Sequence, residues 1–391
     1  MAIEYNLNDM QNRRRKKKLV RFLKKAAVVL VIVALGVLAY IFRAKWIPLF
    51  EGIGAKYQNS VRNSGELAED NFPIKIRGTT EHEIGVIENY LTYLDDTHFY
   101  MYSVDGELVA ERQHSYSSPI LKSGSKRALI YDCGGKKLKV ESRQKTVYEK
   151  EFEGNIILAK LSGNDSSAVV SESDGFACVM YVYNPDGTER YIIKNVDSRI
   201  TDVDFYVGSS GCITANVGVK GGKLISTISK YDFSKTEPDW QSESVDTYAI
   251  SAEILQNGDI AVFGDTKFAY YSSDGSLVGT YAYPSSLSGF SSGGSTSAIL
   301  LKREEFRKST LVIINDVNNP ITIELDKTAK GVYTSEKEVY VLTSDELIAY
   351  SFDGVKIDSI SVSDNYTGFV KIGDHIFLNG YNEINRTDFT G

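Results

Sequence analysis

Residues 179–192 read VMYVYNPDGTERYI, the clearest of several similar stretches in the chain. Alternating apolar and polar residues lead into Pro-Asp-Gly, and a second alternating run follows. Because Asp-Gly accepts the positive φ angle that a tight turn between strands needs, the stretch predicts a β-hairpin. Related stretches place aromatic or β-branched residues before Asp-Gly and a shorter strand after it: FYMYSVDGELVAER (99–112), FAYYSSDGSLVGTY (268–281) and ELIAYSFDGVKIDSI (346–360).

The hairpins repeat at a spacing close to one blade of a β-propeller. The turn that follows the longest alternating strand of each unit recurs about every 36–48 residues, which is the length of four strands and their turns. Eight such turns predict eight blades. Seven blades stays open, because the turns near 144, 234 and 317 lack Asp-Gly. The turns are Asp105-Gly106, Arg143-Gln144, Asp186-Gly187, Ser234-Lys235, Asp274-Gly275, Val317-Asn318, Asp353-Gly354 and residues 388–391.

The two ends of the repeated region are complementary. The final unit, residues 367–391, contains three strands and then stops, whereas residues 72–78 (FPIKIRG) form one strand without a blade. Pairing these ends in one blade would close the ring and remove an exposed sheet edge. A β-sandwich would need two or three domains, yet no linker interrupts residues 79–391, and a parallel β-helix repeats at roughly 20–25 residues. We therefore predict an all-β propeller over residues 72–391.

The N-terminal part of the chain predicts a membrane anchor. Residues 13–25 (RRRKKKLVRFLKK) contain nine basic side chains, and residues 26–42 (AAVVLVIVALGVLAYIF) contain no charge. In a helix, this uncharged run extends about 26 Å, near the lower limit for crossing a bilayer. A cleavable signal peptide is the alternative, but it needs a small-x-small site that Leu38-Ala39-Tyr40 does not provide. We expect a transmembrane signal-anchor helix that contacts the lipid bilayer through residues 26–42.

The charges around this helix predict its orientation. Nine basic residues precede it, against Arg43 and Lys45 just after it. The positive-inside rule therefore places the basic tail, residues 1–25, in the cytoplasm and the remainder outside the cell membrane. Residues 43–71 are expected to be a juxtamembrane spacer, with a short docking helix as the alternative.

The body of the chain is acidic, although its N-terminus is basic. Residues 26–391 contain 35 basic and 49 acidic residues, a balance of −14. Such a body repels phosphate backbones, so we do not expect a nucleic-acid partner.

This layout resembles a family of uncharacterised membrane-anchored β-propellers from Gram-positive bacteria. The resemblance rests on the basic tail, the anchor helix, the propeller and the YxxDG-type hairpins, and it covers nearly the whole chain. The repeats are also similar to quinoprotein-like and Trp-Asp-repeat propellers. The chain departs from both, because it has no recurring Trp-Asp pair and two tryptophans, Trp46 and Trp240, cannot supply one per blade. The resemblance implies fold and topology, and it identifies no catalytic residue.

Motifs with catalytic or metal-binding potential are weak in this sequence. Residues 289–293 (GFSSG) match the Gly-x-Ser-x-Gly nucleophile elbow, but their Ser/Gly-rich surroundings favour a loop over the strand-turn-helix that the elbow needs. Asp202 and Asp204 could be two calcium ligands, but the Gly and Glu of such a loop are missing. Asp95-Asp96 is interpreted as a turn. The four histidines lack metal-ligand spacing and are expected to be packed or solvent-facing; they are His82, His98, His114 and His375.

The three cysteines, Cys133, Cys178 and Cys212, include no Cys-x-x-Cys pair. They fall in successive units, and we expect them on strands as small buried side chains. One disulfide stays open. We predict no catalytic, cofactor-binding or metal-binding residue.

Two classes of function fit these observations. The first is a binding or scaffold module, without catalysis, for a cell-envelope protein or polymer. The second is an extracellular propeller enzyme that acts on a glycan or uses a quinone-type cofactor. A cluster of carboxylates, or Arg with His, converging at the mouth of the central channel would favour the enzyme. A sensor that signals through residues 1–25 is a weaker third option.

Overall fold

The computed structural model describes the following ranges of the chain: residues 66–69, 71–76, 82–303 and 307–389. The predicted tail and transmembrane helix, residues 1–25 and 26–42, lie outside them, as does most of the predicted spacer. Within the described ranges, no helix is long and apolar enough to cross a membrane.

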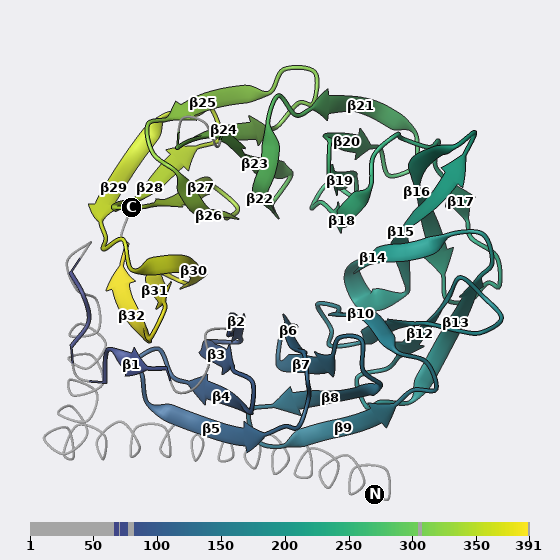
Figure 1. The fold of residues 1–391 in the computed structure, drawn as a ribbon, viewed down its shortest axis with the longest axis horizontal. Coiled ribbons are helices and arrows are strands. Elements are labelled where there is room, and N and C mark those ends of the chain that lie inside the picture. The colour runs from purple at the N-terminus through teal and green to yellow at the C-terminus, as the bar shows by residue number, and fades with distance from the viewer. Residues whose placement is uncertain (1–65, 70, 77–81, 304–306, 390–391) are drawn as a thin grey trace, which may run out of the picture. The chain divides into compact units, whose positions relative to one another are not determined.

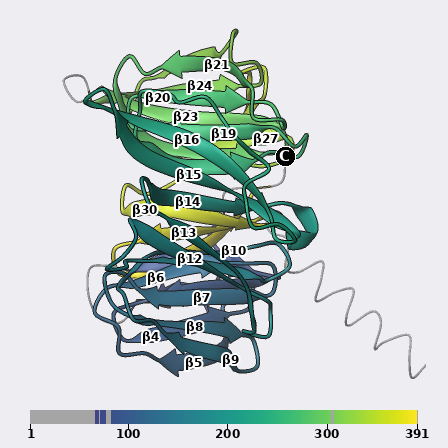
Figure 2. The same cartoon turned by 90° about the vertical axis from the view of Figure 1, so that its right-hand side faces the viewer.

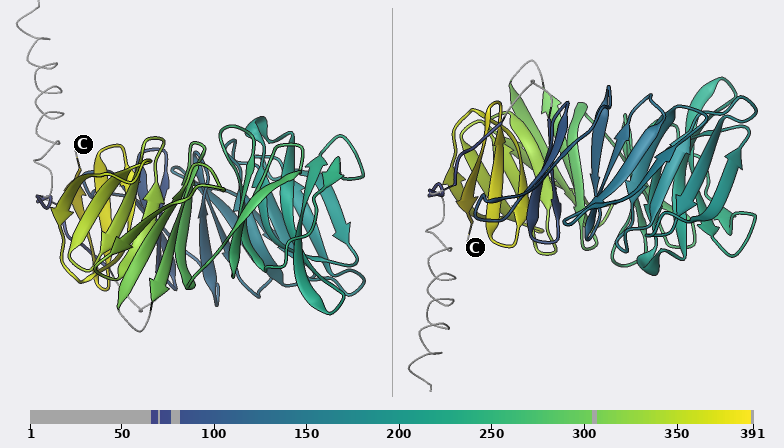
Figure 3. Two further views of the ribbon diagram at one scale, coloured as in Figure 1. Left: turned by 90° about the horizontal axis from the view of Figure 1, so that it is seen from above. Right: turned by 90° about the horizontal axis from the view of Figure 1, so that it is seen from below.

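Eight antiparallel sheets, each of four strands, surround one axis (Figure 1). The first strand of each sheet lies nearest the axis, and the strands follow in chain order toward the rim, except in the last sheet. Figure 2 shows the sheets of neighbouring blades stacked against one another, and Figure 3 shows their connecting loops on two opposite faces of the ring. The predicted β-propeller is confirmed with eight blades.

The strands of the first four blades are short, apart from one hairpin in blade 4. In order they are β2 (Glu83–Ile87), β3 (Tyr90–Leu94), β4 (His98–Tyr102) and β5 (Leu108–Gln113) in blade 1; β6 (Pro119–Ser123), β7 (Arg127–Asp132), β8 (Lys137–Ser142) and β9 (Thr146–Glu151) in blade 2; β10 (Ile156–Leu161), β11 (Ser167–Ser171), β12 (Cys178–Tyr183) and β13 (Glu189–Asn195) in blade 3; and β14 (Arg199–Phe205), the 3-10 helix η1 (Val207–Ser209), β15 (Gly211–Lys220), β16 (Lys223–Asp232) and β17 (Trp240–Gln241) in blade 4.

The other four blades repeat this pattern. Their strands are β18 (Ala249–Ile254), β19 (Ile260–Gly264), β20 (Lys267–Tyr271) and β21 (Leu277–Ala282) in blade 5; β22 (Ser286–Gly293), β23 (Thr296–Arg303), β24 (Lys308–Ile314) and β25 (Ile321–Leu325) in blade 6; β26 (Ala329–Thr334), β27 (Glu338–Thr343), β28 (Glu346–Ser351) and β29 (Lys356–Ser361) in blade 7; and β30 (Tyr366–Ile372), β31 (His375–Gly380), β32 (Glu383–Asp388) and β1 (Ile74–Lys75) in blade 8.

The Asp-Gly turns join the two outer strands of blades 1, 3, 5 and 7. In blade 3 the N–H of Gly187 donates to the carbonyl of Asn184 at 2.9 Å, and the N–H of Asn184 donates to Thr188 at 2.9 Å. Gly187 has a φ of +85°, which glycine adopts without a steric penalty. The Asp186 carboxylate accepts the N–H of Thr188 at 2.9 Å, and the ladder shifts register beside the turn. The predicted hairpin is therefore a turn followed by a β-bulge.

These turns also pack closely against the preceding blade. A Cβ atom on Gly187 would lie 2.7 Å from the ring of Tyr148 in blade 2, and one on Gly275 would lie 2.6 Å from the ring of Trp240 in blade 4. Glycine is therefore needed for the contact between blades as well as for its own φ angle.

The hydrophobic core lies between blades. Cys178 and Met180 of β12 share one cluster with Ile200 and Val203 of β14, and each is at most 1% exposed. Burying an aliphatic side chain of this size stabilises a fold by about 1.5–3 kcal/mol. Because each interface needs side chains from two blades, the ring forms one structural unit.

Blade 8 combines strands from both ends of the described chain. β1 is antiparallel to β32, with Ile74 opposite Ile384 and Lys75 opposite Glu383. The Lys75 ammonium contacts the Glu383 carboxylate at 2.6 Å. The strand predicted at residues 72–78 is thus paired at Ile74 and Lys75.

Candidate functional site

The first strands of blades 3, 4 and 5 bring ionisable side chains together near the axis. Lys160 lies on β10, Asp202 and Asp204 lie on β14, and Glu253 lies on β18. Successive side chains of a strand point to opposite faces, so Asp202 and Asp204 share one face, while Val203 between them is buried in the core. We call Lys160, Asp202, Asp204 and Glu253 the axial cluster.

Asp202 connects three blades. Its Oδ2 atom accepts hydrogen bonds from the Ser251 hydroxyl at 2.7 Å and from the Ala252 N–H at 3.0 Å, both on β18. The Lys160 ammonium of β10 contacts the same carboxylate at 3.3 Å. One carboxylate therefore joins the first strands of blades 3, 4 and 5.

Asp204 and Glu253 lie in less polar surroundings. The Asp204 carboxylate accepts the N–H of Ile254 at 2.8 Å. Burial raises the pKa of Asp204 above its ordinary value, although Lys160 and this hydrogen bond oppose the shift. Burial also raises the pKa of Glu253, against the opposing effects of Lys160 and a hydrogen bond from Ser292. These two carboxyls bind a proton more readily than exposed ones.

Lys160 is the cation of the axial cluster. Its side chain is 26% exposed. Burial by itself would lower the pKa of Lys160, but the nearby Asp202, Asp204 and Glu253 outweigh burial and raise it. The ammonium group therefore stays charged and partly balances three carboxyl groups.

A cavity of about 420 Å³ borders the axial cluster. Lys160, Asp204 and Glu253 form one part of its wall, and Ser292 and Glu336 belong to the adjoining blades 6 and 7. Carboxyls with raised pKa values beside a lysine are groups that can donate and accept protons. Carboxylates therefore converge at this cavity, which is the arrangement that the enzyme hypothesis requires.

Equivalent contacts in other blades favour a structural role for the aspartates. The Ser291 hydroxyl of β22 accepts the N–H of Thr334 on β26 at 2.9 Å. The Glu83 carboxylate of β2 accepts the N–H of Leu121 on β6 at 2.7 Å. In each pair a side chain on one first strand satisfies a backbone donor of the next, which a buried N–H requires. Asp202 follows the same pattern.

The two aspartates of the weak calcium motif contact the neighbouring blade. Asp202 and Asp204 both direct a carboxylate oxygen at backbone N–H groups of β18. Across the described ranges, no group of three or more His, Cys, Asp or Glu side chains has an arrangement that could hold a metal ion.

Three histidines lie apart from the axial cluster. His82 contacts the Asn379 amide oxygen at 2.8 Å, and His98 contacts the Thr97 hydroxyl at 2.9 Å. His114 is buried, and its Nε2 lies 2.9 Å from the Asp95 carbonyl, while its Nδ1 accepts the Tyr116 N–H. This pattern identifies the neutral tautomer, and burial lowers the pKa of His114.

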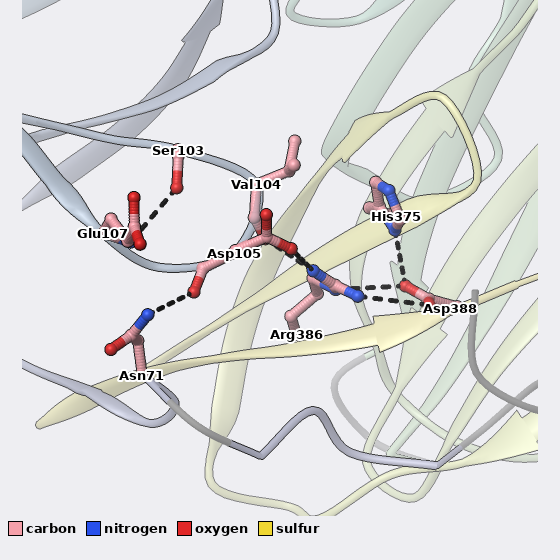
Figure 4. Close-up of polar contacts among 8 residues, drawn as sticks. All are labelled: Asn71, Ser103, Val104, Asp105, Glu107, His375, Arg386 and Asp388. Carbon is pink, nitrogen blue, oxygen red and sulfur yellow. Dashed lines mark hydrogen bonds and ion pairs between the residues drawn. The ribbon is translucent and has the colours of Figure 1, made fainter. Parts of the chain in front are cut away.

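His375 belongs to a network where blade 8 meets blade 1 (Figure 4). Its Nδ1 lies 2.7 Å from Asp388, which also accepts the Arg386 Nε at 3.2 Å. Arg386 Nη1 donates to the Val104 carbonyl at 2.7 Å and to the Asp105 carboxylate at 3.2 Å. Arg386 therefore lies between a carboxylate of blade 8 and a carboxylate of blade 1. The network joins residues that are neighbours in the ring but far apart in the sequence.

The loop predicted at residues 289–293 is wrong. These residues belong to β22, the first strand of blade 6. A Cβ atom on Gly293 would lie 2.3 Å from the Ser335 carbonyl, so the glycine allows blade 7 to approach, and the Phe290 ring stacks on Phe263 with centroids 4.4 Å apart. Strand pairing and this stacking outweigh the low strand preference of Gly and Ser. Ser291 lies within β22, and the turn at residues 294–295 leads into another strand, β23, and not into the helix of a nucleophile elbow.

The cysteines agree with the sequence in part. Cys178 and Cys212 are buried on β12 and β15, as predicted, and all three cysteines are free thiols. Cys133 is different, because it is exposed in the turn after β7. The strand predicted at Cys133 is thus wrong by one residue, because β7 ends at Asp132.

The interpretation of Asp95-Asp96 as a turn is confirmed. The Asp95 carboxylate accepts the N–H groups of Thr97 and His98 at 2.8 and 2.7 Å, which holds the connection between β3 and β4.

Lys160 and Glu253 were missed by the sequence reasoning. Each is a charged residue within the apolar first strand of its blade. Aligning the blades by their turns would place both near the axis with Asp202. The contacts of Lys160 and Ser251 with Asp202 could not be read from sequence, because 42 and 49 residues separate the bonded partners.

Comparison with known proteins agrees with this fold. The chain belongs to the family of unknown function DUF5711, whose model matches residues 73–389. No curated protein sequence matches it.

Two solved structures resemble the chain. BamB from Moraxella catarrhalis is 12% identical with a TM-score of 0.56, and the match covers 83% of this chain and 98% of BamB. Sqt1 from Saccharomyces cerevisiae is 11% identical with a TM-score of 0.58, and the match covers 79% of this chain and 95% of Sqt1. At such low identity the likeness supports the propeller fold alone.

Proposed function

We propose that this member of the family is a membrane-anchored, extracytoplasmic propeller that binds a cell-envelope protein or polymer as a scaffold. The observation that carries the proposal is the use of the aspartates near the axis. Asp202 and Asp204 hold backbone N–H groups of the next blade, so their oxygens serve the rigidity of the ring. By contrast, some apolar side chains are exposed: Val196, just after β13, is 67% exposed, and Val219, near the end of β15, is 75% exposed. A rigid ring that displays such side chains suits binding.

Photo-crosslinking in cells tests this binding function. A photoreactive amino acid is placed at Val219 or Tyr381, which are exposed, and at Val341, which is buried, as the control. The binding function predicts one discrete envelope partner at an exposed position and none at Val341. Equal background at all three positions would contradict it.

The predicted topology supports the extracytoplasmic location. The basic tail precedes the uncharged residues 26–42, and the acidic body follows. Exposed Cys133 provides a test, because Cys178 and Cys212 are buried. A membrane-impermeant maleimide should label intact cells at Cys133, and Cys133→Ser should abolish the labelling. Labelling that needs cell lysis would contradict the topology.

We also infer that β1 closes the ring. Pairing with β32, the hydrogen bond from the Ile76 N–H to Asn382 at 3.1 Å and the buried position of Ile74 support this role. Ile74→Asp should therefore speed hydrogen exchange in β30–β32, whereas β14–β16 should stay protected. An equal change in both blades, or none, would contradict closure by β1.

Glycan hydrolysis is the second candidate function. Its support is the cavity in which Glu253, with a raised pKa, and Asp204 adjoin Lys160. Glycosidases use a protonated carboxylic acid and a second carboxylate in this way. The enzyme predicts release of reducing ends from envelope polysaccharide that Glu253→Gln abolishes. The enzyme would be contradicted if the variant released reducing ends as fast as the unmodified chain, or if neither released any. The binding function would then remain.

A further inference from the structure

Blade 4 has an overhanging hairpin. β15 and β16 contain 10 residues each, whereas β11 and β12 of neighbouring blade 3 contain 5 and 6. The extra length leaves part of the blade 4 face without a blade packed against it. A groove of about 850 Å³ results, which lies within the range of ligand-binding pockets. We call it the blade 4 groove.

Neutral amides and hydroxyls form the floor of the blade 4 groove. The Asn195 amide of blade 3 donates to the Asn216 side-chain oxygen at 3.1 Å, and the Asn216 amide donates to the Ser229 hydroxyl at 3.1 Å. The Gln241 amide donates to the Thr227 hydroxyl at 3.3 Å. These bonds hold the floor in order before any ligand arrives, which lowers the entropy lost on binding.

Two of these amides keep hydrogen-bonding capacity. A side-chain amide has two donors and an acceptor oxygen, and Asn195 and Gln241 each donate one hydrogen bond to the floor. The other N–H and the carbonyl oxygen of each are available to a ligand in the groove. Paired donors and acceptors of this kind match ligands whose hydroxyls both donate and accept.

The charges of the groove select a neutral ligand. The groove is lined by two basic residues, Lys194 and Lys220, and two acidic residues, Asp197 and Glu243. The lining is thus neutral within a body of balance −14. The exposed aliphatic side chains of Val196 and Val219 adjoin it, and they suit the C–H surfaces of sugar rings.

We propose that the blade 4 groove binds a neutral glycan. The proposal rests on the binding function proposed above and specifies its ligand as the polysaccharide of the cell envelope. The hydroxyls would exchange hydrogen bonds with Asn195 and Gln241, and sugar C–H groups would contact the valines at the rim.

Isothermal titration calorimetry provides the test, because the Trp240 ring packs against blade 5 and would not report on the groove. The full chain is purified in a detergent without a sugar headgroup and titrated with N-acetylglucosamine tetramer or maltotetraose. We expect a saturable heat of binding with at least one of these probes. Gln241→Ala should weaken binding about tenfold, and Gln144→Ala, an exposed amide in the β8–β9 turn, should not.

A second variant fills the groove without disturbing the fold. A Cβ atom on Gly218 would have its nearest neighbour at 3.7 Å, so Gly218→Val is accommodated and projects into the groove. It should abolish glycan binding while the circular dichroism spectrum and unfolding midpoint stay unchanged.

The proposal would be overturned if neither sugar gave a saturable response up to about 10 mM, or if Gly218→Val still bound the glycan. It would also be overturned if a peptide or a second copy of the chain bound instead of the sugars and Gly218→Val abolished that binding. If the sugars fail while crosslinking at Val219 or Tyr381 captures an envelope partner, the binding function stands and the glycan proposal falls.

Discussion

The axial cluster and the blade 4 groove are both polar, but they use polarity differently. Near the axis, Asp202 and Lys160 form an ion pair, and Asp202 also accepts hydrogen bonds from the next blade, so that three blades are held together. In the groove, Asn195 and Gln241 are neutral and each keeps capacity for further hydrogen bonds. Charge near the axis therefore serves the construction of the ring, whereas neutral polar groups on β13 and β17, beside the longer hairpin, suit recognition.

Removing Asp202 should give the largest effect. Asp202→Ala leaves Lys160 without its direct partner and removes the acceptor for Ser251 and Ala252. We expect the free energy of unfolding to fall by about 3 kcal/mol, measured by urea denaturation of the full chain in detergent. Asp202→Asn keeps an acceptor oxygen and should lose about half as much. A loss under about 1 kcal/mol in the alanine variant would remove the distinction between the two regions.

Two glycines, one in each region, should give stability changes of intermediate size when each is replaced by alanine. A Cβ atom on Gly293, near the axis, would lie 2.3 Å from a backbone carbonyl, whereas one on Gly218, in the groove, meets nothing nearer than 3.7 Å. Gly293→Ala should lower the free energy of unfolding by about 2 kcal/mol, because backbone must move. Gly218→Ala should be neutral or stabilising by about 0.5 kcal/mol. Thermal unfolding that ranks them in the opposite order would contradict this packing.

Lowering the pH should change the stability of the protein through protonation of Glu253 in the axial cluster. Burial raises its pKa above the ordinary 4.5, so the folded state binds the proton more tightly than the unfolded state. Its contribution to stability is therefore largest at low pH and declines as pH rises through the window above 4.5. Glu253→Gln should be more stable by about 1 kcal/mol at neutral pH and lose that advantage toward pH 4.5. Parallel stability curves for the variant and the unmodified chain would contradict the shift.

The smallest effect is expected in the groove. Gln241 is exposed, and its side chain makes one hydrogen bond, to Thr227. Gln241→Ala should change the free energy of unfolding by about 0.5 kcal/mol or less, in either direction. A loss as large as that of Asp202→Ala would show that the groove is also structural.

The architecture was predictable because it repeats locally. Each Asp-Gly turn needs a glycine with positive φ within a few residues of its strands, so a short stretch of sequence reports it. The prediction failed at residues 289–293, where a Ser/Gly-rich segment became β22. There the deciding contacts come from other strands, among them the Phe290–Phe263 stacking and the approach of Ser335 to Gly293.

The candidate site was less predictable than the fold. Asp202 and Asp204 stood out as a pair that matched a calcium loop only weakly, and nothing else in the sequence indicated a role for them. The structure shows them as partners for backbone N–H groups of another blade. Lys160 and Glu253 carry no motif at all. The sequence did not identify Gln241 or Asn195 as site residues either, because they belong to different blades and come together only in the folded groove.

The hairpins and a propeller of eight or seven blades could be read from the sequence, because turn chemistry and strand alternation act over a few residues; the structure established eight blades. The uncharged residues 26–42 and the basic tail likewise predict an anchor and its orientation from local composition. Only the tertiary structure decided which carboxylates meet Lys160, and where the long β15–β16 hairpin leaves a face uncovered. These features depend on contacts between blades, and such contacts are set by how the ring packs.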